Sequence, residues 1–345
     1  MEYRHKIMRT AVGMLIDKAI RDVQSDPRRS IRNLADMGDS FSKTPAQKQF
    51  FQLAHEILKN PDNPYNELIS KLARNVCPDT VKTVSLNFGY TGLNYGAAVL
   101  RTKEAAAGKN IPWLIRFDCS VRGGNGLNLR EMNTILADSA SLGIYTCVIR
   151  LGDCGEKMEQ VLKLCKNHKE CCFFVAVDPK IALTLHKEQM IKTSNLILCV
   201  DVTDSENTRA QDRIFHRLHE WKCFYGFYAC YHAENVEVLT SERFTQRMID
   251  RGCMFGCYVN RDFREKQLEE KMYRHVCARR GKKGEPLFVF ELNRDEKYIS
   301  DTILCGRELC IGPDGKAPLA DGRLADMHSV LLSEMVKVPE IQFVS

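Results

Sequence analysis

From Pro112 onwards, short apolar runs alternate with stretches of helical periodicity, and this alternation restricts the possible folds more than any other feature of the chain. The first run covers residues 113–117, and the first helical stretch, residues 129–141, begins after Asn128 and ends near Gly143. Asn favours the N-cap of a helix, and Gly favours the position just beyond its last turn. Five more apolar runs follow, at residues 144–149, 171–177, 196–200, 226–231 and 254–259. Strands joined by helices in this way predict a parallel sheet covered by helices, here an open or partial barrel of six strands.

Residues up to about 105 have the periodicity of helices instead. Apolar side chains recur there at three- and four-residue spacing, which places them on one helix face. Asn60-Pro61-Asp62-Asn63-Pro64 interrupts this pattern with a turn, because proline fixes φ and Asn and Asp favour turns. The sequence therefore predicts an α/β protein in three parts: a helical N-terminal region over residues 1–108, the partial barrel over 109–300, and a short C-terminal segment over 301–345.

Composition and charge exclude several classes of protein. Fifteen cysteines occur in a long chain without a signal peptide, so we expect reduced thiols in a cytoplasmic protein. No run approaches the roughly 20 apolar residues of a membrane span. The formal net charge of +6 is spread among 44 acidic residues, and the one compact basic cluster, residues 279–283, lacks the interleaved aromatic side chains of single-strand binders. Neither a membrane nor a nucleic-acid partner is expected.

Four carboxylates follow predicted strands: Asp118, Asp153, Asp178 and Asp201. The carboxyl ends of parallel strands meet at one edge of a sheet, and the functional groups of such folds gather there. An ionised carboxylate accepts two hydrogen bonds from a diol, so these residues are candidates for binding a ribose. The alternative is that each carboxylate caps the following helix or stabilises a turn, which is the commoner role of a single Asp at such a position.

Other motifs are weaker. Gly123-Gly124-Asn125-Gly126 could approach a phosphate, but it lacks the Walker lysine and the dinucleotide-binding spacing. Cys119 or Cys154 could act as a nucleophile only with a histidine partner, which the sequence does not place. Cys253 and Cys257 would need two more ligands to bind zinc, so buried thiols are the simpler interpretation. No catalytic residue and no metal-ligand set is therefore assigned.

The run from Ile111 onwards resembles the radical S-adenosylmethionine (SAM) superfamily. Ile111-Pro112-Trp113 resembles the entry to the first strand and Asp118 its end, and the likeness, which extends over most of the chain, is to bacterial members with a helical leader. It implies a TIM-barrel-like core of the partial (β/α)6 type. In that family the position of Asp118 is soon followed by C-x-x-x-C-x-x-C, whose three thiolates hold a [4Fe–4S] cluster with SAM on the fourth iron. Here Cys119 stands alone, and the next cysteine is Cys147.

The resemblance also implies positions for SAM itself. Gly152 and Asp153 stand where the family has Gly-Gly-Glu-Pro, which holds the SAM amino group. Asp201 matches a strand-end acid at the ribose, Arg209 matches an arginine near the SAM carboxylate, and Tyr228 belongs to a run that resembles the strand beside adenine. The expected cofactor site comprises Asp118, Cys119, Gly152, Asp153, Asp201, Arg209 and Tyr228.

The C-terminal segment resembles the start of an auxiliary-cluster segment of the SPASM type. Cys305 and Cys310 are in place, but Leu319 stands where a further cysteine is usual. The apolar residues Ile303 and Leu304 and the run Leu309-Cys310-Ile311 predict that this tail packs on the barrel.

The missing cysteines bear on function because several thiolates hold an iron–sulfur cluster, and the reductive cleavage of SAM needs an electron delivered through it. No [4Fe–4S] cluster is therefore expected. The resemblance then favours a pseudoenzyme, a binding or regulatory protein with a remnant pocket that binds SAM weakly and with a small-molecule or protein partner of unknown identity. Two alternatives remain open: an enzyme of non-radical chemistry in the same barrel mouth, and a radical SAM enzyme with unusual cluster ligands.

Overall fold

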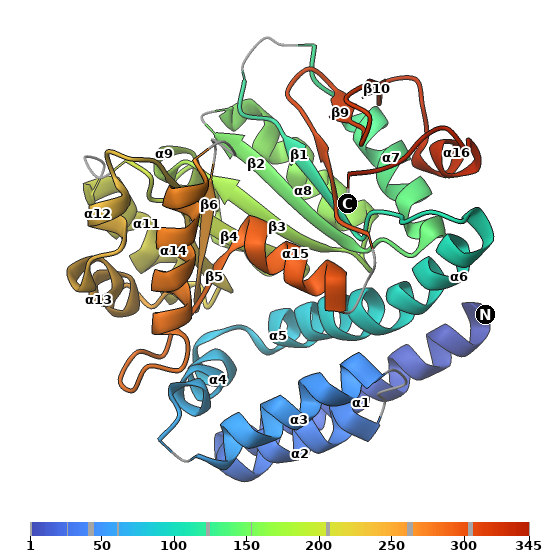
Figure 1. Cartoon of the computed structure of the whole chain (residues 1–345). Coiled ribbons are helices and arrows are strands. Elements are labelled where there is room, and N and C mark those ends of the chain that lie inside the picture. The colour runs from blue at the N-terminus through green and yellow to red at the C-terminus, as the bar shows by residue number, and fades with distance from the viewer. Residues whose placement is uncertain are drawn as a thin grey trace.

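The structure, a computed structural model, describes residues 2–25, 27–40, 45–60, 62–121, 125–152, 154–204, 208–260, 265–302 and 306–344. The chain is an α/β protein built on a curved main sheet of eight strands, all parallel, which forms a half-barrel (Figure 1). The predicted α/β fold with a partial barrel is confirmed, although the sheet has eight strands where the apolar runs predicted six.

Six strands coincide with the predicted apolar runs, and two short strands extend the sheet at its edges. The strands are β1 (Leu114–Asp118), β2 (Thr146–Gly152), β3 (Cys172–Val177), β4 (Leu196–Asp201), β5 (Tyr225–Tyr231), β6 (Phe255–Asn260), β7 (Phe288–Glu291) and β8 (Glu308–Ile311). Their order across the sheet is β7-β6-β5-β4-β3-β2-β1-β8. The two additional strands therefore lie at opposite edges.

The outer face of the sheet is covered by the helices that connect the strands (Figure 1). These helices are α7 (Leu129–Leu142), η2 (Gly155–Lys157), α8 (Met158–Asn167), α9 (Pro179–Ala182), α10 (Lys187–Ile191), α11 (Thr208–Glu220), α12 (Val236–Leu239), α13 (Glu242–Asp250) and α14 (Lys266–Arg279). The first of them begins with a capping box between Asn128 and Glu131, as the sequence predicted for its N-cap, and ends at Gly143 in the left-handed conformation. Buried side chains such as Ile115, Phe117 and Ile135 form the core between these two layers.

The N-terminal helices fill much of the concave face. They are α1 (Glu2–Ser25), α2 (Pro27–Ser40), α3 (Pro45–Lys59), α4 (Pro64–Asn75), α5 (Pro78–Val84), the π-helix η1 (Ser85–Gly96) and α6 (Ala97–Ala107). Val12 and Ile16 of α1 and Val81 of α5 belong to one buried cluster with Ile197 and Cys199 of β4. The helical leader is thus packed against the sheet and covers part of its concave face.

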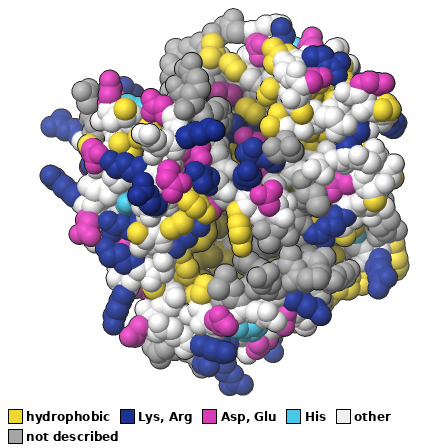
Figure 2. Space-filling model, viewed as in Figure 1, with side chains coloured by type: hydrophobic (Ala, Val, Ile, Leu, Met, Phe, Trp, Pro, Cys, Tyr) yellow, Lys and Arg dark blue, Asp and Glu magenta, His cyan; other side chains and the backbone are white. Residues whose placement is uncertain are grey.

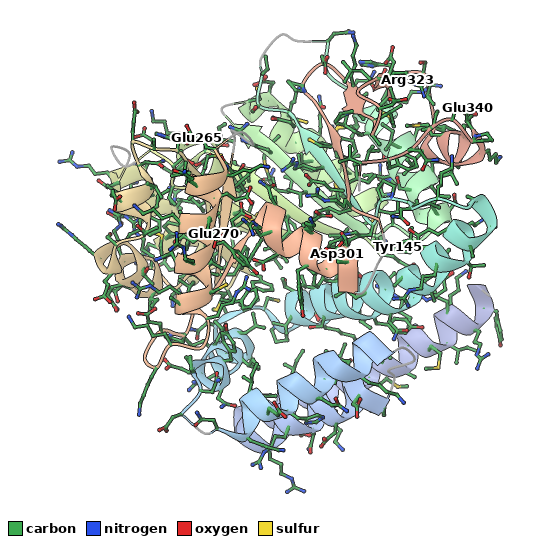
Figure 3. The ribbon with its side chains drawn as sticks, in the orientation of Figure 1. Tyr145, Glu265, Glu270, Asp301, Arg323 and Glu340 are labelled. Atoms are coloured by element: carbon green, nitrogen blue, oxygen red, sulfur yellow. The ribbon has the colours of Figure 1, made fainter. Side chains whose placement is uncertain are left out.

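The helix α15 (Leu292–Thr302) crosses in front of the concave face (Figure 1). It follows β7 and precedes β8, which lie at opposite edges of the sheet, so the connection has to span the opening of the half-barrel. Figure 3 labels Asp301 near its C-terminal end, beside the label of Tyr145, with Glu270 of α14 and Glu265, which precedes α14, further to the left.

The C-terminal tail packs on the barrel. β8 pairs with β1, and Leu309 and Ile311 are buried in the outer core, so the expected packing of these two residues is confirmed; Ile303, Leu304 and Cys305 lie outside the described residues. β9 (Lys316–Pro318) and β10 (Leu324–Asp326) form a hairpin, and α16 (Leu332–Lys337) follows. The buried Lys109 ammonium donates to the carbonyl oxygens of Val338 and Ile341, which holds the end of the chain.

Three properties of the surface and the thiols complete the description. In the part of the chain that the structure describes, every helix is too short or too polar to cross a bilayer. The fourteen cysteines described there are free thiols, most of them buried. The basic cluster of residues 279–283 pairs with acidic neighbours: Arg279 with Glu285, Arg280 with Asp295, and Lys283 with Asp62.

Candidate ligand-binding site

Polar side chains gather on the concave face of the sheet. Asp118, Arg150 and Asp201 lie towards the carboxyl ends of their strands, Arg116 and Tyr228 lie in mid-strand, and Glu308 begins β8. Side chains alternate between the two faces of a strand, so residues two apart share a face. Ile115 and Phe117 of β1 belong to the outer core, which places Arg116 and Asp118 on the concave face. The residues that we call the concave-face cluster are Arg116, Asp118, Arg150, Asp201, Tyr228, Cys230, Glu308 and Cys310. Figure 2 shows basic and acidic side chains close together on the face that α15 crosses.

Arg150 lies at the centre of this cluster. Its Nη1 is 3.3 Å from Asp118 Oδ2 and donates to Ser120 Oγ at 3.0 Å, and the Ser120 hydroxyl in turn donates to Asp118 Oδ1 at 2.5 Å. Burial lowers the pKa of Arg150, but Tyr228, Cys230 and the neighbouring carboxylates outweigh this effect and raise it above its usual value. Arg150 therefore stays charged, and it links residues of β1, β2, β4 and β5.

Asp201 lies at the end of β4 and is largely buried. Its Oδ1 accepts a hydrogen bond from the backbone N–H of Thr203 at 2.9 Å. Burial raises the pKa of Asp201, while Thr203 and Arg150 act in the opposite direction. Such a carboxyl retains acceptor capacity, because one carboxylate offers about four lone-pair sites.

Tyr228 and Cys230 are neighbours on the concave side of β5. The Cys230 thiol donates to the Tyr228 hydroxyl at 3.3 Å, and the backbone N–H of Cys230 donates to Thr203 Oγ1 at 2.8 Å. Burial raises the pKa of both side chains. Both are therefore neutral near pH 7 and act as hydrogen-bonding or packing groups rather than as anions.

A second charged pair joins β1 to β8. Arg116 Nη2 lies 2.7 Å from Glu308 Oε1, and each side chain is only 14% exposed. Burial lowers the pKa of Arg116, but Glu308 and Cys310 outweigh it and raise that pKa above its usual value. Burial likewise raises the pKa of Glu308, against the effect of Arg116.

The buried side of α15 is polar where it covers this region. Asn293, Glu296 and Ser300 are spaced three and four residues apart, which puts them on one helix face, and all three are buried. Glu296 accepts from Ser300 Oγ at 2.9 Å and from Arg307 Nε at 3.1 Å, and Trp113 Nε1 donates to Ser300 Oγ at 3.2 Å. A polar helix face over polar strands is unusual for a core, because buried polar groups need partners.

The structure brings together some of the expected cofactor residues. Asp118 pairs with Arg150, and Asp201 and its register partner Tyr228 are close enough to affect the pKa of Arg150. Gly152 ends β2 with φ +54°, and a Cβ there would lie 2.7 Å from Ser120 Cβ, so glycine permits the close approach of the two loops. Asp153 lies outside the described residues.

Two expected residues lie elsewhere. Cys119 is buried in the outer core near Cys154 and Lys157, because the alternation that turns Asp118 to the concave face turns Cys119 away from it. Burial raises the pKa of Cys119 to about 11. Arg209 is exposed on α11, and within the described ranges no hydrogen bond or ion pair joins it to the concave-face cluster.

Comparisons with known proteins give only weak likenesses. No family model and no curated protein matches the chain. Among solved structures, Streptococcus suis SuiB bound to S-adenosylmethionine is 11% identical, with 81% of this chain and 77% of that chain covered and a TM-score of 0.48. The structure of anSMEcpe with bound AdoMet and Cp18Cys peptide is 10% identical, with 66% and 80% covered and a TM-score of 0.41.

A third match is to a carboxyl transferase domain rather than to a structure with bound SAM. The carboxyl transferase domain of Rhizobium etli pyruvate carboxylase with 3-bromopyruvate is 10% identical, with 66% of this chain and 43% of that chain covered and a TM-score of 0.38. Matches at this level do not assign a family.

The donor set after β1 does not fit a [4Fe–4S] cluster. Residues 119–128 contain one cysteine, Cys119, and its thiol lies on the outer side of the sheet. Within the described ranges, no group of three His, Cys, Asp or Glu side chains lies close enough to hold a metal ion. A hollow of about 350 Å³ occurs at the end of α6, lined by Arg101, Glu104 and Lys109 among others, but no residue of the concave-face cluster lines it.

Reasoning from the sequence missed Arg116, Arg150, Glu308 and Cys310. A usable signal was present for the two arginines, since each stands inside an apolar strand, in Leu-Ile-Arg-Phe and Val-Ile-Arg-Leu. A charge within such a run indicates a buried pair or a site. No local signal pointed to Glu308, whose partner lies 192 positions earlier.

Proposed function

We propose that this protein binds SAM, or a related adenosyl ligand, at the concave-face cluster, and that it does so without a [4Fe–4S] cluster, as a binding or regulatory protein of the radical SAM type of half-barrel. The observation that carries the proposal is that Asp118, Arg150 and Asp201 lie towards the carboxyl ends of their strands, with Arg150 paired to Asp118 and Tyr228 the register partner of Asp201. Ligands of parallel α/β folds bind at this end of the sheet.

The chemistry of these residues suits an adenosyl ligand. Asp201 has lone pairs left for the two hydroxyl groups of a ribose. The Arg150 Nε is buried and has no partner among the described residues, so the guanidinium can donate to an acceptor of the ribose or the adenine. Tyr228 contributes an aromatic ring beside these polar groups. SAM would lack the chelating iron, so we expect a Kd on the order of a millimolar, which is about −4 kcal/mol.

Cys119 supports the binding function over radical chemistry. A cluster needs several thiolates at the site, whereas residues 119–128 hold one cysteine, whose buried thiol lies on the outer side of the sheet. Non-radical catalysis has little support either, because burial keeps Cys230 and Tyr228 neutral and makes neither a ready nucleophile.

Calorimetric titration with SAM tests the proposal. We expect Asp201→Asn to weaken binding at least tenfold, because an amide oxygen can still accept from Thr203 but the charge on the ligand side is lost. Asp326→Asn is the matched control, since its Oδ1 accepts a backbone N–H two residues on, at His328, in the distant tail. Absence of a binding signal at millimolar SAM, or equal binding by both variants, would refute the proposal.

A further inference from the structure

The Arg116–Glu308 pair makes only half of the contacts open to it. An arginine and a carboxylate can form a fork in which two N–H groups meet both oxygens. Here the Nη2–Oε1 contact of 2.7 Å is made, but Arg116 Nε and Glu308 Oε2 are buried and have no hydrogen-bond partner among the described residues. One donor on a cation and one acceptor on an anion thus remain open within this pair.

This arrangement is costly unless something satisfies it. A buried polar atom without a partner costs about 1–3 kcal/mol, and more when it is charged. A buried ion pair also adds little stability compared with apolar residues of the same size. The polar face of α15 covers this pair. Its Glu296 raises the pKa of Glu308 further, which adds to the free-energy cost of burying the charges. Stability alone therefore does not account for a polar interior at this place.

We propose that Arg116 and Glu308 form a subsite for a zwitterionic α-amino-acid group, with its carboxylate on Arg116 and its ammonium on Glu308. A phosphate or simple carboxylate would meet the like charge of Glu308, and a simple amine would meet that of Arg116, so only a ligand with both charges suits both open groups. Tyr228 and Cys257, which adjoin Arg116, provide less polar surroundings for the rest of the ligand.

Two sources carry this chemistry: a free amino acid and the methionyl end of SAM. The subsite uses Arg116 and Glu308, whereas the proposed adenosyl site uses Asp201 and Arg150. The inference therefore does not rest on the proposed function, and either can fail alone.

The experiment titrates the full-length protein with L-methionine, N-acetyl-L-methionine, L-methionine methyl ester, SAM and 5′-methylthioadenosine. We expect each blocked methionine to bind at least tenfold more weakly than L-methionine, or, if SAM is the source, 5′-methylthioadenosine to bind at least tenfold more weakly than SAM. These comparisons use the unaltered chain, so they do not depend on the folding of a variant.

A paired substitution adds a second arm. Arg116→Gln with Glu308→Gln removes both charges together, and Arg279→Gln with Glu285→Gln is the control, because that pair is equally close at 2.7 Å and similarly buried, with side chains 10% and 14% exposed. We expect the first pair to weaken binding of L-methionine or SAM at least tenfold and the control to leave it unchanged.

The outcomes separate the two ideas. Binding of 5′-methylthioadenosine that depends on Asp201, with amino-acid groups making no difference, would overturn the subsite and leave the adenosyl site standing. Binding of L-methionine that depends on Arg116 and Glu308, without any binding of SAM or 5′-methylthioadenosine, would support the subsite alone. Equal binding of blocked and free methionine, or no binding of any probe at millimolar concentration, would overturn it.

Discussion

Arg150 and Asp118 are register partners on the neighbouring strands β2 and β1, and their side chains meet on the concave face with Nη1 3.3 Å from Oδ2. Parallel pairing places both at the carboxyl end of the sheet, where the approach of the loop after β1 adds Ser120 to the contact. The strand register that extends the sheet therefore also brings Arg150 and Asp118 together in the concave-face cluster.

The first prediction concerns this pair. Arg150→Met should lower the free energy of unfolding by about 2–4 kcal/mol, because Asp118 and the largely buried Asp201 lose the positive charge between them. Adding Asp118→Asn should recover part of the loss, since one of the two uncompensated charges is removed. Urea denaturation of the wild type, the single and the double variant measures this. A loss below about 0.5 kcal/mol would mean that the pair behaves as an exposed ion pair.

The second prediction concerns the tail. Lys109→Met should cost about 1–3 kcal/mol, because its ammonium donates to the carbonyl oxygens of Val338 and Ile341 and a charged hydrogen bond is worth that much. Hydrogen exchange should quicken first in residues 332–344. Lys163→Met is the control, since its partner Glu159 is an exposed residue one helical turn away. If both variants unfold at the same denaturant concentration, Lys109 does not anchor the tail.

The fold could be predicted in outline from the sequence because its signals are local. Continuous apolar runs identified β1 to β6, and Asn128 and Gly143 marked the ends of α7. β7 and β8 were missed because each has only four residues, too few for a clear pattern. β8 also joins β1 from far along the chain, and pairing over that distance leaves no local trace.

The site was less predictable, for two physical reasons. Strand alternation, applied to Asp118, would have placed Cys119 on the outer face, but the resemblance to a cluster-binding loop outweighed it. Arg116 and Glu308 indicate a site only as a pair, and the pair can be recognised only once β8 is known to lie beside β1. Of the positions implied by the resemblance, Asp118 and Asp201 lie at strand ends on the concave face, whereas Arg209 lies exposed on α11.

The third prediction is a pH dependence of stability. Glu291 is buried at the end of β7, where its Oε1 accepts from the Tyr231 hydroxyl at 3.0 Å and its Oε2 from the backbone N–H of Arg294 at 2.7 Å. Burial raises its pKa to about 7, against the lowering effect of these hydrogen bonds. An unfolded Glu titrates near 4.3, so between about pH 4.3 and 7 the folded chain keeps a proton that the unfolded chain has released.

Stability contributed by Glu291 is therefore complete below that window and is lost as the pH rises through 7, by up to about 3 kcal/mol. Glu291→Gln mimics the protonated form, so its stability relative to the wild type should increase from pH 5 to pH 8. Chemical denaturation of both proteins at four pH values measures the difference. A difference that stays constant with pH would show that Glu291 does not titrate in this range.

The iron and acid-labile sulfide content after anaerobic reconstitution measures whether the half-barrel holds an iron–sulfur cluster. Cys119 is the one cysteine in residues 119–128, and its buried thiol points away from the site, so we predict well under one iron and one sulfide per chain and no cluster absorbance. Near-stoichiometric iron and sulfide, about four of each per chain with the absorbance of a [4Fe–4S] cluster, would contradict the account.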